Sequence, residues 1–258
     1  MSELEAAAAA LLRAERERRP VAPLTETLRG ITVDDAYAVQ LAGRALRLAD
    51  GGRRLVGRKV GLTSRAMQEL LGVDQPDFGY LLDDMLIAPG AEVPFARFLA
   101  PRVEAEIAFL IARPLEGEGL TVDDVLAATE AVALALELVD SRIADWRIAI
   151  EDTIADNASS GAAVVGAWRP LAEVGELAAL EVTMRVGEQV VEGRGDAVLG
   201  HPATPVAWLA AALARHGERI EPGEVVIPGS VVPALTLAPG DVAHAACPGL
   251  GEVEVRVA

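Results

Sequence analysis

Residues 101–112 alternate between two kinds of side chain, a pattern that predicts a β-strand with two different faces. Glu104 and Glu106 share one face with Ala108, and the other face is apolar, with Ala105, Ile107 and Phe109. Two carboxylates that lie side by side repel each other unless they are protonated, solvated or bridged by a cation. The pair therefore indicates either a solvated edge of a sheet or part of a cation site.

A second segment, residues 133–139, is apolar throughout except for Glu137. Such a run predicts a buried segment, and an isolated buried carboxylate is unfavourable unless it finds a partner. Arg142, which is near in sequence, could supply that partner in a salt bridge. Alternatively, Glu137 is a third oxygen ligand beside Glu104 and Glu106. Three carboxylates without a cysteine or histidine cluster would suit a hard cation, Mg²⁺ or Mn²⁺.

Lys59 lies in a short β-like segment between Gly57 and Gly61, where the backbone can approach a ligand closely. Near a cation its pKa would fall, and the side chain could then transfer protons. The other interpretation is a solvated surface lysine. The small polar side chains of Asp140–Arg142 and Asp152–Gly161 indicate either a loop that donates hydrogen bonds to a ligand or a helix cap and turn.

The remaining pattern predicts a single α+β domain. Helical spacing and end signals predict helices over residues 2–18, Thr32 to about Asp50, Thr63–Leu71, Thr121 to about Val132, and Val206–Arg215. Short β-like segments are found at Leu55–Leu62, Leu180–Val186, Val190–Gly193, Val225–Ile227 and Val253–Val257. We expect a mostly helical N-terminal layer over 1–75 and a β-rich, metal-binding catalytic core over 76–258, together forming one compact unit.

The formal net charge of −16 argues against nucleic acid and against an anionic membrane surface as partners. No segment reaches the roughly 18 to 20 apolar residues that a membrane-spanning helix needs. The N-terminus has no basic region of the kind that opens a signal peptide. The single cysteine, Cys247, excludes an intramolecular disulfide. These features predict a cytoplasmic protein.

Six segments occur in an order that resembles a known family. They are Lys59–Ser64, Gln75–Gly79, Pro101–Phe109, Glu137–Arg142, Asp152–Ser159 and Val198–Pro202. Over residues 30–257 the chain resembles the 2-hydroxypenta-2,4-dienoate (2-keto-4-pentenoate) hydratases of aromatic meta-cleavage pathways, members of the fumarylacetoacetate hydrolase superfamily. The resemblance implies a mixed, β-rich core of that type with a helical N-terminal layer.

The resemblance also implies roles for individual residues. It matches the metal ligands to Glu104, Glu106 and Glu137, and the catalytic lysine to Lys59, with Asp77 as its helper. It places Gly61, Leu62, Ser159 and Ser160 around a small 2-oxo or 2-hydroxydienoic acid. It further implies Mg²⁺ or Mn²⁺ and a homo-oligomer, often pentamer-based.

Other functions stay open at this point. The related 4-oxalocrotonate decarboxylases share the metal site, although Asp140–Trp146 and Gly229–Ser230 look more like the hydratases. Hydratase and decarboxylase of this family associate, so the chain could instead be a non-catalytic partner of a decarboxylase. The intact set of three glutamates and Lys59 argues against that role. A protein that only binds an oxo acid is the remaining alternative.

Two places depart from the family pattern. Pro228 stands where a serine or threonine is expected before Gly229. Arg194 and Asp196 place charges where the family is usually small and neutral. If that loop lines the pocket, the substrate preference differs.

Overall fold

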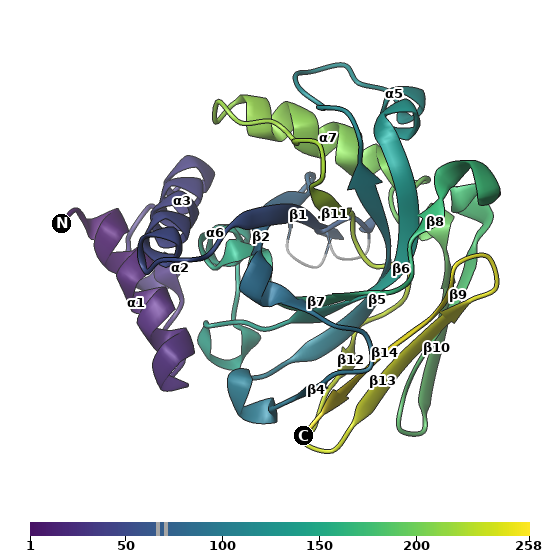
Figure 1. Ribbon diagram of the computed structural model, residues 1–258. Helices are drawn as coiled ribbons and strands as arrows, with labels where there is room; N and C mark the ends of the chain where they lie inside the picture. The colour runs from purple at the N-terminus through teal and green to yellow at the C-terminus, as the bar shows by residue number, and fades with distance from the viewer. Residues whose placement is uncertain (66–67, 70–71) are drawn as a thin grey trace.

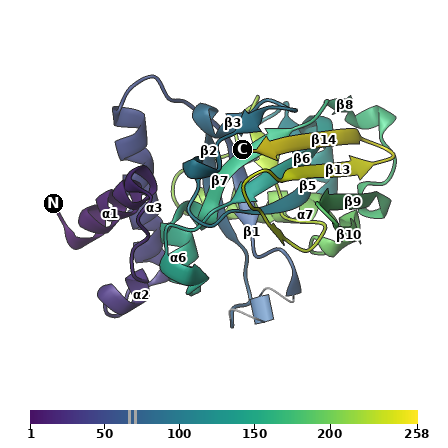
Figure 2. The same cartoon turned by 90° about the horizontal axis from the view of Figure 1, so that it is seen from below.

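Three helices form a layer at one end of the molecule (Figures 1 and 2). The computed structural model describes residues 1–65, 68–69 and 72–258. The helices of the layer are α1 (Glu3–Glu17), α2 (Leu24–Thr27) and α3 (Val33–Ala49). Ser2 and Thr32 begin α1 and α3 with capping boxes, in which cap and third residue satisfy each other's backbone N–H. The helices predicted over residues 2–18 and from Thr32 to about Asp50 are confirmed as α1 and α3. The helix predicted over Thr63–Leu71 includes residues 66–67 and 70–71, which lie outside the described residues.

The larger sheet is curled and lies at the centre of the molecule (Figure 1). Within the described residues it has nine strands, in the order β2-β1-β11-β5-β6-β7-β3, with β12 beside β5 and β8 beside β6. The strands are β1 (Leu55–Gly61), β2 (Asp77–Leu82), β3 (Leu86–Ile87), β5 (Arg102–Ile111), β6 (Thr129–Val139), β7 (Ser160–Val165), β8 (Arg169–Pro170), β11 (Val225–Ile227) and β12 (Leu235–Thr236).

A smaller sheet packs beside it, with β13 and β14 in contact with β6 (Figure 2). Its strands run in the order β10-β9-β13-β14-β4. Their bounds are β4 (Glu92–Val93), β9 (Glu181–Val186), β10 (Gln189–Arg194), β13 (Val242–Cys247) and β14 (Gly251–Val257). Further α-helices of the described residues are α5 (Val122–Ala128), α6 (Ile150–Ala155) and α7 (Ala203–Ala214). Among the described residues, no helix is long and apolar enough to cross a membrane.

The two faces of β5 behave as its alternation predicts. Ala105, Ile107 and Phe109 are fully buried in the main apolar core. Ala108 belongs to a second apolar cluster, in which it joins Ala135 of β6 and Ala163 of β7. Small side chains on these three neighbouring strands leave the adjacent glutamates room on the inner side of the curl.

Two predictions about the chain's organisation need comment. The helix expected to run to about Val132 was wrong beyond Ala128, because β6 begins at Thr129 and pairs with β5 along its whole length. Within residues 1–75, β1 is part of the larger sheet, where it lies between β2 and β11. The helices of the N-terminal layer therefore end at Ala49, and the division at residue 75 stays a prediction.

A network of charges ties the helical layer to the sheet. Arg44 of α3 pairs with Glu218, which follows α7. Arg58 of β1 contacts the same carboxylate at 2.8 Å and lies 3.5 Å from Glu224. Burial alone would raise the pKa of Glu218, but the two arginines lower it to about 2. Glu218 therefore stabilises the folded chain only while it is ionised.

Replacing Glu218 by Gln is expected to reduce the free energy of unfolding at pH 7 by about 1–3 kcal/mol, because the buried Arg58 and the half-buried Arg44 lose a charged acceptor. The folded pKa lies below the ordinary value of 4.5, so the stabilisation is complete above that value and is lost as the pH falls toward 2. Denaturant unfolding of both proteins between pH 7 and pH 3 checks this. A difference that stays constant over that range would contradict it.

Candidate metal centre

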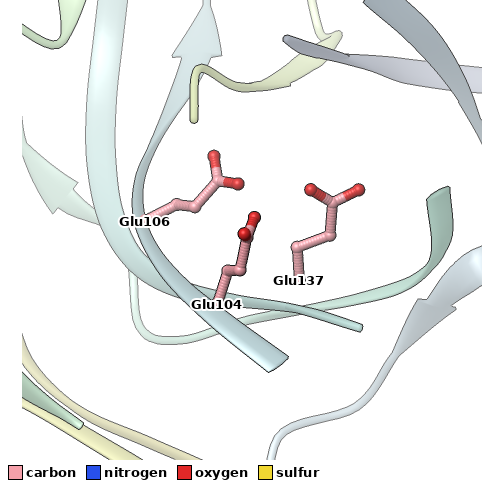
Figure 3. Close-up of side chains that lie close together, drawn as sticks. All are labelled: Glu104, Glu106 and Glu137. Carbon is pink, nitrogen blue, oxygen red and sulfur yellow. The ribbon is translucent and has the colours of Figure 1, made fainter. Parts of the chain in front are cut away.

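Three carboxyl groups converge on the inner side of the larger sheet (Figure 3). Glu104 of β5 lies directly opposite Glu137 of β6 in the antiparallel register, and Glu106 follows two residues later on the same face of β5. One oxygen from each lies within 4.8 Å of the others. Glu106 and Glu137 are fully buried, whereas Glu104 is half-buried.

Several carboxylate oxygens of this group make no hydrogen bond to the described residues. Glu106 Oε1 and both carboxylate oxygens of Glu137 are buried with no hydrogen-bond partner among the described residues, while Glu106 Oε2 accepts the Gly229 N–H at 2.6 Å. Burial, with repulsion from Glu137, raises the pKa of Glu104 to about 7 and that of Glu106 well above its ordinary value. Orphaned, mutually repelling carboxylates are stabilised when a cation binds between them.

The donor set fits a hard divalent cation. All three ligating groups are oxygens, which Mg²⁺, Mn²⁺ and Ca²⁺ prefer. Oxygens bound to one such cation lie roughly 3 to 4 Å apart, so the group needs only a small adjustment to bind one. The ammonium of Lys59 balances one of the three negative charges, and the two that remain match a divalent ion.

Lys59 lies across from Glu137 and is 3% exposed. Its Nζ is 3.4 Å from Glu137 Oε2 and donates to the Ala158 carbonyl at 2.8 Å. The alternative salt bridge between Glu137 and Arg142 was wrong, because Arg142 pairs with Asp156. Burial lowers the pKa of Lys59, but the surrounding carboxylates, Glu137 first, raise it overall. Lys59 is also the single lysine of the chain, and all other strongly basic side chains are arginines.

Asp77 of β2 lies opposite Gly61 of β1 in the sheet register. Its Oδ2 accepts a hydrogen bond from the Thr153 hydroxyl at 2.7 Å, whereas its buried Oδ1 has no hydrogen-bond partner of normal geometry. A Cβ at Gly61 would lie 2.3 Å from Asp77 Oδ1 and 3.2 Å from Lys59 Nζ. The bare backbone of Gly61 therefore leaves the space in which the two side chains face each other. Leu62 follows with a left-handed backbone (φ 56°).

Gly61→Ala is expected to reduce turnover about 100-fold, because the added methyl displaces Asp77 and a shift near 1 Å in a reacting group has an effect of that size. Gly43→Ala is the matched control, since nothing lies within 4 Å of a Cβ at that helical position. Steady-state kinetics and thermal unfolding of both variants test the prediction. Unchanged turnover in Gly61→Ala would contradict it.

The loop after α6 has an unusual backbone. Asn157, Ala158 and Ser159 are all left-handed, with φ of 57°, 48° and 54°. Consecutive non-glycine residues in this region are strained and persist only where the surroundings impose them. The Asn157 amide supplies one restraint, because it accepts from the Tyr80 N–H at 2.8 Å and donates to the Tyr80 carbonyl at 3.0 Å. This backbone conformation points the Ala158 carbonyl toward Lys59.

Arg142 supplies the second restraint on this loop. Its guanidinium is buried, pairs with the Asp156 carboxylate and donates to the carbonyls of Asp140 and Ser160 at 2.7 and 2.9 Å. The hydroxyls of Ser159 and Ser160 are buried, and neither makes a hydrogen bond within the part of the chain that the structure describes. Of the two interpretations of these segments, the turn describes Asp140 to Arg142, and ligand binding by the two serines at the end of the loop stays a prediction.

The structure thus brings Lys59, Gly61, Asp77 and the three glutamates together. The residues that depart from the family pattern are not members of this group. Arg194 and Asp196 pair with each other at 3.5 Å, and both side chains are about half exposed. Pro228 is buried directly before Gly229, whose N–H binds Glu106. The residues not singled out from the sequence are Thr153 and Asn157, although both lie in a segment noted for its small polar side chains.

Comparisons with known proteins identify the family of the chain. The family model described as fumarylacetoacetate (FAA) hydrolase C-terminal matches residues 54–258. A 2-hydroxyhexa-2,4-dienoate hydratase of Comamonas testosteroni is 44% identical over 249 residues, which cover 95% of this chain and 94% of that protein. A 2-keto-4-pentenoate hydratase of Paraburkholderia xenovorans is 44% identical over 254 residues, with 98% and 94% covered.

Two solved structures are similar to this chain, to different extents. A 4-oxalocrotonate decarboxylase from Pseudomonas putida G7, complexed with magnesium and adipate, has a TM-score of 0.95 and 36% identity. The match covers 99% of this chain and 97% of that one. A fumarylpyruvate hydrolase from Pseudomonas aeruginosa, in complex with Mn²⁺ and pyruvate, has a TM-score of 0.60 at 20% identity, covering 78% of this chain and 88% of that one. The second likeness shows a shared fold alone.

Proposed function

Because the chain belongs to the fumarylacetoacetate hydrolase family, we propose that it is a divalent-metal-dependent hydro-lyase. It adds water to 2-hydroxypenta-2,4-dienoate and forms 4-hydroxy-2-oxopentanoate, a step in the meta-cleavage degradation of aromatic compounds. The observation that carries the proposal is the buried group of three glutamates facing Lys59, in a chain 44% identical to proteins named as such hydratases.

Glu104, Glu106 and Glu137 hold the cation, and Mg²⁺ or Mn²⁺ suits their oxygens. The bound ion supplies Lewis-acid stabilisation of negative charge on the 2-oxygen of the substrate. Gly229 fixes one oxygen of Glu106 through its N–H, so that the other oxygen faces the common space. The unpartnered hydroxyls of Ser159 and Ser160 and the backbone at Gly61 and Leu62 bind the substrate.

The net reaction needs two proton movements and one molecule of water. The substrate's 2-hydroxyl loses its proton and C5 gains one, which leaves a conjugated 2-oxo-3-enoate. Water then loses a proton as its oxygen bonds to C4, and C3 gains a proton. Lys59 Nζ carries these proton transfers, because Ala158 and Glu137 hold it beside the three glutamates of the proposed metal site. Asp77 Oδ1, which has no partner of its own, assists as the second proton acceptor.

Two substrates supplied side by side test the proposal. With Mg²⁺ present, 2-hydroxypenta-2,4-dienoate should be converted to 4-hydroxy-2-oxopentanoate, which is identified by mass spectrometry. The corresponding six-carbon 2-oxo-3-enedioate should release no CO₂ above the uncatalysed rate. Binding of the dienoate without its conversion would contradict the proposal and would indicate a protein that only binds the oxo acid.

A second candidate function is decarboxylation of the 2-oxo-3-enedioate. The similarity over the full length to a solved 4-oxalocrotonate decarboxylase favours it. This reaction breaks the bond to the distal carboxylate and releases CO₂. The electron pair of that bond stays on the carbon chain, which becomes the dienolate form of 2-hydroxypenta-2,4-dienoate. Release of CO₂ in the paired assay, without hydration of the dienoate, would establish it. The higher identity to hydratases, 44% against 36%, places hydration first.

We also propose that the chain works in the cytoplasm as a homo-oligomer, and that it can associate with a sibling decarboxylase. The first part is supported by the single, buried Cys247, which needs no oxidising compartment. Assembly follows from the family resemblance. Sedimentation of the purified chain measures the homo-oligomer, and co-purification with the decarboxylase tests the mixed complex.

A further inference from the structure

Thr153 of α6 makes the hydrogen bond that holds Asp77. Its side chain is 4% exposed, and its hydroxyl oxygen lies 2.7 Å from Asp77 Oδ2 and 3.0 Å from the Ile150 carbonyl oxygen. A threonine hydroxyl has one proton to donate and can accept another. With Asp77 ionised, the hydroxyl donates to the carboxylate. With Asp77 protonated, the carboxyl group donates to the hydroxyl, which then donates to Ile150.

The helical layer fixes Thr153 relative to Asp77. The Gln40 amide of α3, which is 3% exposed, donates to the carbonyls of Phe78 and Ile154 at 2.8 Å each. These carbonyls belong to the residues that directly follow Asp77 and Thr153. A single buried amide therefore joins β2 to α6 at the point where the two side chains meet.

The start of α6 is fixed in the same way. The Asp152 carboxylate accepts from the Ala149 N–H at 3.0 Å, which caps the helix. It also accepts from the Thr25 hydroxyl of α2 at 2.8 Å. Thr153 is thus carried on a short helix whose position does not depend on its own contact with Asp77.

The carboxyl group of Asp77 faces charged groups on several elements. Burial raises its pKa, and the Lys59 ammonium on β1 lowers it. Glu104 on β5 and Tyr37 on α3 are close enough for the Asp77 charge to raise their pKa values. With Oδ2 held by Thr153, the unpartnered Oδ1 lies at Gly61, beside Lys59.

We propose that Thr153 is a positioning residue, whose hydroxyl keeps the Asp77 carboxyl group in one orientation whether it is ionised or protonated. Without this hydrogen bond the plane of the carboxyl group could turn, and neither oxygen would then stay at Gly61 beside Lys59. This inference rests on the proposed function of Asp77 in the hydration reaction. It adds a residue that touches neither substrate nor metal and acts through Asp77.

Three variants test the proposal. Thr153→Val keeps the shape but lacks the hydroxyl, and it should lower kcat about 10- to 100-fold, the effect of losing one buried hydrogen bond, with KM within about 2-fold. The acidic limb of the kcat/KM profile should move to higher pH, because an ionised carboxylate has lost a donor. Thr153→Ser should restore most of kcat. Thr129→Val, which removes a hydroxyl bonded to the Val125 carbonyl away from the site, should leave kcat unchanged.

A double-mutant cycle with Asp77→Asn separates this inference from the function on which it rests. If Thr153 acts through Asp77, Thr153→Val should have little further effect in the Asp77→Asn background. A loss of kcat that persists in that background, or that Thr153→Ser does not recover, would overturn the inference alone. Full activity of Asp77→Asn would overturn the proposed role of Asp77 and the inference with it.

Discussion

Glu137→Gln is expected to weaken the binding of Mn²⁺ or Mg²⁺ by at least about 100-fold, since even residues that only support metal ligands have effects of 10- to 100-fold. Glu137 is fully buried, and within the described residues neither of its carboxylate oxygens has a hydrogen-bond partner, although Lys59 Nζ lies 3.4 Å from Oε2. The amide keeps the size of the side chain but removes its charge and one of its acceptor oxygens. Turnover should fall with the loss of metal. Calorimetric titration of the metal-free protein measures the change directly.

The control for this variant lies on the same strand. Glu130→Gln, at the exposed start of β6, removes the same charge far from the cluster and should leave metal affinity unchanged. Thermal unfolding should accompany both titrations, because Lys59 is left buried with a neutral neighbour in Glu137→Gln. A folded Glu137→Gln protein that binds Mn²⁺ with the affinity of the unaltered protein would show that the cluster is not the metal site.

Lys59→Met is expected to lower turnover about 100- to 10,000-fold, the usual contribution of a general acid or base. Metal affinity should rise in the same variant, because Lys59 is the cation that balances Glu137 when no metal is bound. Opposite changes in the two quantities distinguish loss of proton transfer from collapse of the site. Equilibrium metal titration and single-turnover kinetics measure them separately.

Lys59→Arg separates charge from proton transfer. Arginine keeps the positive charge, but it does not release its proton within the range where proteins are stable. The variant should therefore be nearly as inactive as Lys59→Met. Recovery of turnover by arginine would assign Lys59 an electrostatic role and contradict its role in proton transfer. Because the chain has one lysine, selective ¹⁵N-lysine labelling also gives a single Nζ signal with which to follow its protonation.

Local patterns were enough to predict much of the fold, whereas for the three glutamates they left a metal site and a salt bridge to Arg142 as alternatives. The alternation of residues 101–112 placed Glu104 and Glu106 on one face, and the apolar run around Glu137 predicted its burial. The end of α5 could not be found in this way, because β6 is selected by its pairing with β5. Thr129 begins that strand directly after the helix, with no glycine or proline between them.

The partners of the buried charges were harder to predict. Arg142 is five residues from Glu137, yet it binds Asp156, and Glu137 instead faces Lys59 of β1. That contact depends on how the sheet curls, which no short segment specifies. The left-handed backbone from Asn157 to Ser159 is likewise imposed by Tyr80 and Arg142 rather than by its own residue types.

The most direct test of the account is to add metal to the metal-free protein in the presence of 2-hydroxypenta-2,4-dienoate, while the dienol absorbance is followed and the product identified. We predict no decay above the uncatalysed rate before Mg²⁺ or Mn²⁺ is added, and 4-hydroxy-2-oxopentanoate as the product afterwards. Formation of that product at an equal rate without metal would contradict the metal-dependent mechanism. Absence of the product from folded, metal-loaded protein would contradict the hydratase function.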